Sequence, residues 1–261
     1  NDLLPLGYQV VCYEKHDRLG GLMLTNIPSF RLPARVLDDE IGFVVDMGLD
    51  VRLTTAVTSM KALLDEGYDA VFVGVGAPRG KNLELPGRYD TPNVHIGIDW
   101  LESVAFQHID TVGERVLVVG VGNTAMDCCR TAKRIGGKDV KVMARRGRKD
   151  FKASEWELED AEGERVEVVE YHAPKEFVVE DGVLKGMAFD RVESYVDEAG
   201  KDRSRPVEEV FIPCDDVILA IGQENAFPWM ERNLGIEFGK WDMPVVDRGT
   251  MQSTLPGVFF G

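Results

Sequence analysis

Two glycines at the end of an apolar run are the residues of this chain best suited to hold a phosphorylated ligand. Residues 115–119 (RVLVV) lead into GVGNTA at positions 120–125, a Gly-x-Gly-x-x-Ala pattern. Gly120 allows a tight turn off the expected strand, and Gly122 has no Cβ, so a pyrophosphate can approach its backbone. This spacing predicts a turn that binds the phosphates of a dinucleotide.

A helix must follow this turn for the phosphates to be held. The pattern from Asn123 to Ile135 is helical, and its first turn offers unpaired N–H groups and the positive end of a dipole to an anion. Ala125 is small enough for the helix to pack closely on the preceding strand. A second strand is expected over residues 140–144, which completes the order strand, glycine turn, helix, strand.

Arginines after the second strand indicate which dinucleotide binds. An NAD site has an acidic residue there for the ribose 2′-hydroxyl, but this chain has Arg145 and Arg146, with Arg148 close by. Guanidinium groups bind a 2′-phosphate through charge-assisted hydrogen bonds. The motif therefore predicts NADP(H). The alternative interpretation is an ordinary strand-to-helix turn followed by a solvated basic cluster.

Composition excludes several classes of function. The chain has 261 residues and a formal net charge of −15, which argues against nucleic acid as a partner. No apolar run approaches the 18 or more residues of a membrane span, so no membrane partner is expected. The acidic balance is compatible with docking to a basic protein surface.

No set of side chains with catalytic or metal-binding spacing is found. The four cysteines (Cys12, Cys128, Cys129 and Cys214) form no C-x-x-C pair, so no zinc, iron–sulfur or dithiol site is predicted within the chain. They are expected to be buried and reduced, as in a cytoplasmic protein. The histidines (His16, His95, His108 and His172) are scattered. We therefore predict no catalytic residue and no metal ligand.

A second region with ligand-binding character precedes the glycine turn. Glu14 follows the β-branched and aromatic run 8–13, where a carboxylate can accept hydrogen bonds from a ribose diol. This run alone favours a surface glutamate at a strand end. Gly20-Gly21-Leu22 then permits close backbone approach to a planar ligand, and IPSFRLP at 27–33 supplies an extended loop.

These segments together resemble a known family. Glu14, GGL at 20–22, IPSFRLP at 27–33, GNTAMD at 122–127 and AIGQ at 220–223 occur in the order found in the small (β) chain of NADPH-dependent glutamate synthase and its relatives. The family consists of flavoproteins with two dinucleotide-binding domains. The resemblance implies hydride transfer from NADPH to FAD, and then electron transfer to a partner subunit or iron–sulfur domain.

The resemblance also implies a fold class and domain boundaries. We expect an α/β protein in which a Rossmann-like NADPH-binding domain (80–214) is inserted into a truncated Rossmann-like FAD-binding domain (1–79 and 215–261). The family's first FAD glycine loop and its final Gly-Asp are absent from residues 1–261. The sequence is therefore expected to be a fragment with an incomplete FAD site.

Site residues follow from matching the family's motifs to this sequence. The residues expected to bind a cofactor are Glu14, Gly21, Leu22, Arg31, Val57, Gly76, Gly120, Gly122, Asn123, Thr124, Ala125, Asp127, Arg145, Arg146 and Gly222. Lys152 and Ala153, in the loop after the arginines, are expected as secondary contacts.

Further elements are expected from local patterns. We predict a helix over 33–47, strands over 50–57 and 69–75, and an antiparallel meander over 166–212 with turns at 181–182 and 198–201. Ser154 and Glu157 match a capping box, and the acidic segment around them is expected to be a solvated helix face.

Of three other functions, the first is excluded and the other two are compatible with parts of the pattern. A disulfide reductase of the thioredoxin reductase type would need a C-x-x-C or C-x₄-C pair, which the chain lacks. A ferredoxin-NADP reductase or dihydropyrimidine-dehydrogenase-like module shares the same flavin and NADPH cores. A non-catalytic nucleotide-binding domain is the third alternative.

Overall fold

The computed structural model describes residues 1–196, 200 and 202–261, and it divides into two compact units. The first unit contains residues 1–79 and 223–261, and the second contains residues 80–222. The two segments at which the chain crosses between them, β4 (Arg79–Gly80) and β13 (Gln223–Glu224), pair with each other.

A five-stranded parallel sheet forms the centre of the second unit. Its strands lie in the order β5-β12-β6-β7-β8, and every neighbouring pair is parallel. Their bounds are β5 (Val94–Ile96), β12 (Asp216–Leu219), β6 (Arg115–Val119), β7 (Asp139–Met143) and β8 (Glu167–Val169). From β6 the chain progresses outward to β7 and β8, whereas β12 and β5 lie on the other side of β6. This reversal makes the gap between β6 and β12 a topological switch point.

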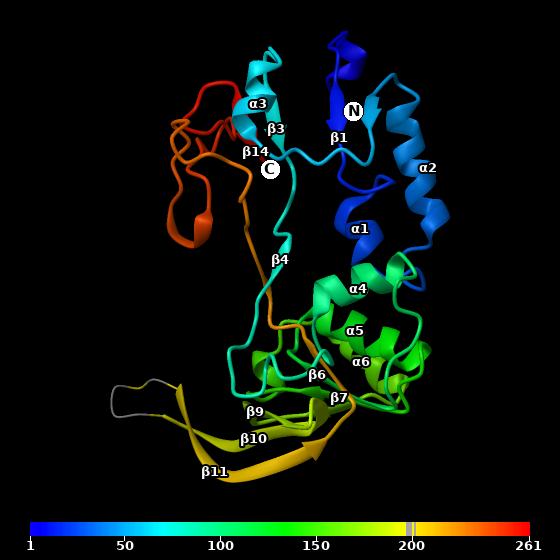
Figure 1. The fold of residues 1–261 in the computed structure, drawn as a ribbon, viewed down its shortest axis with the longest axis vertical. Coiled ribbons are helices and arrows are strands. Elements are labelled where there is room, and N and C mark those ends of the chain that lie inside the picture. Colours follow the sequence, from blue (N-terminus) through cyan, green and yellow to red (C-terminus); the bar gives the residue numbers. More distant parts are fainter. Residues whose placement is uncertain (197–199, 201) are drawn as a thin grey trace. The chain divides into compact units, whose positions relative to one another are not determined.

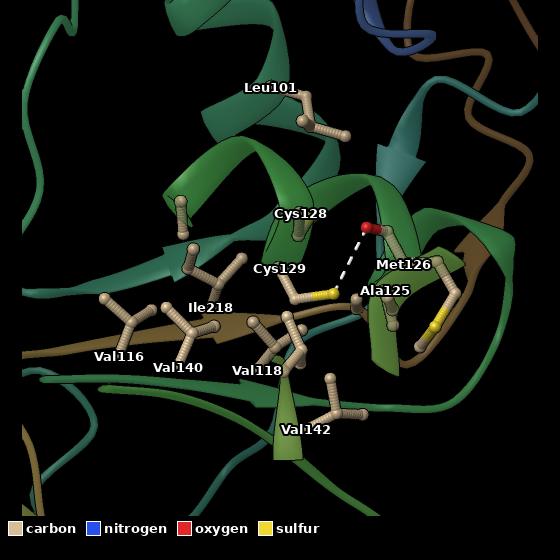
Figure 2. Close-up of a cluster of buried hydrophobic side chains, with 14 of the residues drawn as sticks. Leu101, Val116, Val118, Ala125, Met126, Cys128, Cys129, Val140, Val142 and Ile218 are labelled. Atoms are coloured by element: carbon tan, nitrogen blue, oxygen red, sulfur yellow. Dashed lines mark hydrogen bonds between the residues drawn. The ribbon is translucent and has the colours of Figure 1, made fainter. Parts of the chain in front are cut away.

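Both faces of the sheet are covered, and the side chains of β6 alternate between them. Val116 and Val118 pack beneath the helices α4 (Gly97–Ala105), α5 (Asn123–Arg134) and α6 (Glu155–Gly163), in the cluster drawn in Figure 2. Leu117 and Val119 contribute to a separate cluster on the opposite face. The four residues after Arg115 in β6 are therefore all valine or leucine, because neither face meets solvent there.

A three-stranded antiparallel sheet covers that opposite face. Its strands are β9 (His172–Glu180), β10 (Val183–Val196) and β11 (Asp202–Pro213), visible as the long ribbons of Figure 1. Phe177, Met187 and Phe189 enter the shared core. Asp181 and Gly182 both have positive φ (51° and 78°), which confirms the predicted hairpin turn. Of the second predicted turn, 198–201, only Gly200 is among the described residues.

The predicted meander is wrong at its start. Residues 167–169 form β8, which pairs in parallel with β7 rather than with β9. A three-residue strand with one flanking turn does not reveal whether its partner is parallel, so local alternation could not distinguish these cases. Further along the meander, β10 is one continuous strand with an irregularity between Arg191 and Val192.

The first unit contains two short parallel strand pairs. β1 (Val11–Tyr13) pairs with β2 (Asp50–Arg52), and β3 (Val71–Val73) pairs with β14 (Val258–Phe260). Its helices are α1 (Gly21–Thr25), α2 (Ala34–Val45) and α3 (Met60–Asp65). Short 3₁₀ turns occupy Leu4–Leu6 and Lys240–Asp242 in this unit, and Arg148–Asp150 in the second unit. The predicted strand 50–57 ends early, at Arg52, because Thr54 adopts a positive φ of 51°.

The core of the first unit gathers segments that are far apart in sequence. Met60 of α3, Val73 of β3 and Phe260 of β14 are buried together with Phe227. Tyr13 at the end of β1 packs against this cluster, and its hydroxyl lies 2.8 Å from that of Tyr68. Residues before position 80 and after position 222 therefore share one core.

The second domain boundary differs from the expected one. Residues 215–222 were expected to belong with the outer domain, but β12 lies between β5 and β6 in the sheet of the second unit. The α/β class itself is confirmed, since parallel strands alternate with helices in this unit. No helix in the described part of the chain is long and apolar enough to span a membrane.

Candidate functional site

The glycine turn lies at the carboxyl end of β6, beside the switch point. Gly120 has φ +130°, and a Cβ on it would lie 2.2 Å from the carbonyl oxygen of Ala220, just after β12. Only glycine fits this close approach of two backbones. At Gly122 a Cβ would meet nothing within 4 Å. The first glycine therefore serves the fold, and the second leaves open space where a ligand is expected.

Helix α5 begins directly at this open position. Gly122 is its N-cap residue, and no side chain caps the first turn. Asn123 is exposed and Thr124 half-buried, whereas Ala125 and Asp127 are 0% and 4% exposed. Ala125 packs against the sheet as expected. Because no side chain caps the first turn of α5, its N–H groups can bind an anion, while the apolar face of the helix stays packed on the sheet.

The predicted arginines lie in a loop between β7 and α6, which we call the arginine loop (residues 145–154). Arg145 and Arg146 are exposed, and neither forms an ion pair with a residue that the structure describes. Arg148 differs, because its guanidinium pairs with Glu155 at 2.7 Å and with Glu162 at 2.5 Å. Of the three arginines in the cluster, two are therefore available to an anionic ligand.

The arginine loop folds back onto the glycine turn. The backbone N–H groups of Lys152 and Ala153 both donate to the carbonyl oxygen of Val121 at 3.0 Å. The N–H of Ser154 donates to Oδ1 of Asn123, also at 3.0 Å. The expected secondary contacts Lys152 and Ala153 thus lie directly beside the predicted phosphate-binding turn.

Two residues that follow β8 contact the arginine loop near its start. Glu170 accepts a hydrogen bond from the N–H of Arg148 at 3.2 Å, and a Cβ on Gly147 would lie 2.2 Å from the hydroxyl of Tyr171. Sequence reasoning missed Glu170 and Tyr171 because it placed them in an antiparallel meander. The available signal was their position directly after the short apolar pair Val168-Val169, which follows helix α6.

Helix α6 anchors the far end of the loop through buried charges. Arg130 of α5 is 7% exposed and pairs with Asp160 and Glu164, each at 2.9 Å. Glu157 is fully buried, 3.7 Å from the same guanidinium. The predicted solvated face is therefore wrong at Glu157, because this residue faces α5.

The predicted capping box is also wrong. Ser154 is the N-cap residue of α6, but its side chain makes no capping hydrogen bond. The partner expected for the box, Glu157, is committed to the buried charge cluster with Arg130. The sequence pattern located the start of the helix correctly and misidentified the interactions that fix it.

The segment after β12 completes the edge around the switch point. Gly222 has φ +115°, is exposed, and accepts a hydrogen bond from the N–H of Lys81 at 2.9 Å. The glycine turn and the residues that lead to Gly222 lie side by side, because Gly120 and Ala220 are in close contact. Two of the expected cofactor-binding segments are thus brought to one edge of one sheet.

The predicted residues of the first unit are only partly brought together. A Cβ on Gly76, which has φ +65°, would lie 3.5 Å from Leu22 Cδ1, and Leu22 follows Gly21 at the start of α1. Glu14 ends β1 and accepts a hydrogen bond from the N–H of His16. Arg31 closes a turn onto Pro28.

Val57 lies elsewhere in the first unit. It packs at the margin of the core cluster around Met60. Its role in cofactor binding stays a prediction, as do those of Glu14 and Arg31.

Thiol chemistry is disfavoured by burial. Cys128, Cys129 and Cys214 are buried and Cys12 is half-buried, and all four are free. Burial raises the pKa of the Cys129 and Cys214 thiols to about 12, so they carry almost no thiolate at neutral pH. Among the described residues no group of histidine, cysteine, aspartate or glutamate side chains could hold a metal ion.

Comparison with known proteins identifies relatives over nearly the whole chain. Residues 27–261 match the pyridine nucleotide-disulphide oxidoreductase family. The NADP(+)-dependent formate dehydrogenase subunit beta of Moorella thermoacetica is 35% identical over 98% of this chain and 37% of its own length. The NADPH glutamate synthase small chain of Azospirillum brasilense is 31% identical over 99% of this chain and 57% of its own. The resemblance inferred from the motifs is therefore confirmed.

Solved structures share the fold. FprA from Mycobacterium tuberculosis in complex with NADPH superimposes with a TM-score of 0.77 at 16% identity, over 97% of this chain and 71% of that protein. Thioredoxin reductase from T. acidophilum gives a TM-score of 0.70 at 14% identity, over 99% of this chain and 83% of that protein. The chain spans between 37% and 57% of the length of the two curated relatives described above.

Proposed function

This chain belongs to the pyridine nucleotide-disulphide oxidoreductase family, and from that premise we propose that it transfers a hydride from NADPH to FAD. The electrons then pass to a partner subunit or to an iron–sulfur centre outside residues 1–261. The observation that carries the proposal is the carboxyl edge of the five-stranded sheet. An uncapped helix start, an open glycine and two exposed arginines without ion pairs to described residues follow β6 and β7 there.

The residues at this edge fit the phosphates of NADPH. The open position at Gly122 accommodates a pyrophosphate against the first turn of α5. Arg145 and Arg146, at the end of the second strand, would hold the 2′-phosphate. The hydrogen bonds from Lys152 and Ala153 to Val121 keep the arginine loop next to the phosphates. These residues bind and orient the cofactor, and none of them needs to move a proton.

The fit to FAD rests on the first unit. Gly20 and Gly21 have positive φ values of 133° and 50°, and Leu22 next to them is 38% exposed and close to Gly76. A flat apolar ligand could lie against such a backbone. In the proposed reaction NADPH supplies a hydride and FAD accepts it, so the cofactors carry the chemistry and the protein supplies geometry.

The partner is proposed from relatives that are named as subunits. NADP(+)-dependent formate dehydrogenase subunit beta and NADPH-Fe(3+) oxidoreductase subunit beta of Geobacter sulfurreducens both match more than 90% of this chain. A ferredoxin-NADP reductase or dihydropyrimidine-dehydrogenase-like module remains the second candidate, because a solved ferredoxin reductase also shares this fold. Buried, unpaired cysteines support a reducing, cytoplasmic setting.

Substitution of Arg145 tests the choice of cofactor. We expect Arg145→Ala to weaken NADPH binding by about 10- to 100-fold and NADH binding little, because only NADPH carries the 2′-phosphate. Dissociation constants for both nucleotides, measured by fluorescence titration, check this. Arg205→Ala is the matched control, since Arg205 pairs with Glu193 on the antiparallel sheet. Equal losses for both nucleotides in the Arg145 variant would refute the assignment.

An absorption spectrum tests the transfer step. A yellow protein that NADPH bleaches under anaerobic conditions supports hydride transfer to FAD. A colourless chain that still binds NADPH would contradict the flavin part of the proposal and favour a nucleotide-binding domain without catalytic activity.

A further inference from the structure

The exposed side chain of Asn123 is engaged with the arginine loop. Asn123 is the first residue of α5, and its Oδ1 accepts the N–H of Ser154, the N-cap residue of α6. The two residues are 31 positions apart in sequence. This hydrogen bond joins the first turns of two helices that both begin at the carboxyl edge of the sheet.

The same contact belongs to a set of three hydrogen bonds. Lys152 and Ala153 donate to Val121 O, and Ser154 donates to Asn123, each at 3.0 Å. Three consecutive N–H groups of the arginine loop therefore bind the residues on either side of Gly122. We call this arrangement the loop clasp. Only the bond from Ser154 ends on a side chain, so it is the one of the three whose acceptor a substitution can remove.

We propose that Asn123 is a positioning residue for nucleotide binding, which acts by holding the arginine loop against the glycine turn rather than by contacting the nucleotide. This inference rests on the proposed function, since it assigns a role within the NADPH site. The carboxamide oxygen, which is the acceptor of the side chain, is already bound to the protein. A loop ordered before the nucleotide arrives loses less conformational entropy on binding.

Substitution of Asn123 separates positioning from direct contact. Asn123→Ala removes the acceptor, and alanine is favourable within a helix. We expect the Lys152 and Ala153 amides to exchange about three- to tenfold faster without nucleotide, and NADPH to bind weaker by a similar factor. Hydrogen exchange by mass spectrometry on peptides covering residues 148–158 and fluorescence titration measure the two effects. Asn123→Asp keeps an acceptor oxygen and should retain the slow exchange, whereas its negative charge beside the phosphates should weaken NADPH binding.

A second variant removes the donor instead. Ser154 has φ −65°, the value that proline fixes, so Ser154→Pro deletes the N–H without requiring a new conformation at this residue. We expect it to reproduce the effects of Asn123→Ala. The double variant should then bind NADPH no more weakly than either single variant, because all three lack the same bond. Additive losses in this cycle would overturn the proposal.

The matched control lies at the other end of the same sheet. Asn93→Ala removes an amide that donates to Asp216 at 3.1 Å, and it should leave loop exchange and NADPH affinity unchanged. Wild-type exchange and affinity in Asn123→Ala would overturn the proposal. So would an Asn123→Asp variant that exchanges as fast as Asn123→Ala, because a retained acceptor oxygen would then not hold the loop. A wild-type chain that binds no NADPH would refute the proposed function, whereas the exchange measurements still test the clasp.

Discussion

The two edges of the five-stranded sheet differ in whether their charged side chains are bound to other protein groups. At the amino edge, Asp216 accepts hydrogen bonds from Asn93, His95 and the N–H of Gly113, at 2.8 to 3.1 Å. Asp215 next to it pairs with Arg115 at 2.5 Å. At the carboxyl edge, by contrast, Arg145 and Arg146 are exposed without an ion pair to any described residue.

The backbone differs between the edges in the same way. At the amino edge the N–H groups of Gly113 and Arg115 are both bound by aspartate side chains. At the carboxyl edge the first turn of α5 has no side-chain cap. Since unsatisfied N–H groups and unpaired cations both favour an anion, the carboxyl edge is arranged for a ligand and the amino edge for stability.

Adding one methyl group at each edge gives the largest expected effect. A Cβ at Gly120 would lie 2.2 Å from Ala220 O, at a φ of +130°. We expect Gly120→Ala to destabilise the fold by on the order of 3 kcal/mol and to abolish NADPH binding. Gly113→Ala, whose Cβ would lie 2.4 Å from that of Asp215, should lower Tm but leave the affinity of the folded protein unchanged.

Calorimetry and nucleotide titration well below Tm check these two variants. Gly163→Ala is the neutral control, because a Cβ there meets nothing within 4 Å. Wild-type NADPH affinity in folded Gly120→Ala, or loss of binding in Gly113→Ala, would erase the distinction between the edges.

Arg148 provides an intermediate test within the carboxyl edge. Its guanidinium is engaged by Glu155 and Glu162, and these contacts hold its pKa above the ordinary arginine value. We expect Arg148→Ala to weaken NADPH and NADH equally, by about two- to fivefold, because the arginine loop becomes less ordered. Titration with both nucleotides measures this ratio. A loss confined to NADPH would make Arg148 a phosphate ligand, like Arg145.

The smallest expected effect is a pH dependence at the amino edge. The Arg115 guanidinium hydrogen-bonded to Asp215 lowers the pKa of this carboxyl below its ordinary value of 3.8. A lowered folded-state pKa stabilises the fold above the ordinary pKa, and the contribution disappears as pH falls through the folded-state value. Asp215→Asn should therefore lower Tm by about 1 to 2 °C at pH 7 and progressively less toward pH 3.

Thermal scans from pH 7 to pH 3 check this difference. NADPH affinity at pH 7 should be the same in wild type and Asp215→Asn, since Asp215 lies at the amino edge. A constant difference in Tm across this range would contradict the assigned ion pair.

Much of the carboxyl edge could be predicted from local sequence. The run 115–119, the glycines and the helix from Asn123 are consecutive, and each has a distinct steric requirement, so β6, α5 and β7 were expected in this order. Glu170 and Tyr171 could not be found in this way. They depend on β8 joining the parallel sheet beside β7, which local alternation does not specify.

The charges on α6 show the same limit. A helix beginning after Ser154 was predictable, but the burial of Glu157 depends on Arg130 approaching from α5. An acidic segment is normally solvated, and only a specific cation on a neighbouring helix reverses that expectation.

By itself, the sequence determined which residues could bind phosphates, because the conformational freedom of Gly120 and Gly122 and the charge of Arg145 are properties of single residue types. The tertiary structure decided which of them are available. Arg148 has the same chemistry as Arg145, yet two glutamates of α6 engage it. Asn123, expected from its motif to bind a cofactor, accepts a hydrogen bond from a residue 31 positions away. Pairing over such separations depends on how helices and strands pack, which no local pattern encodes.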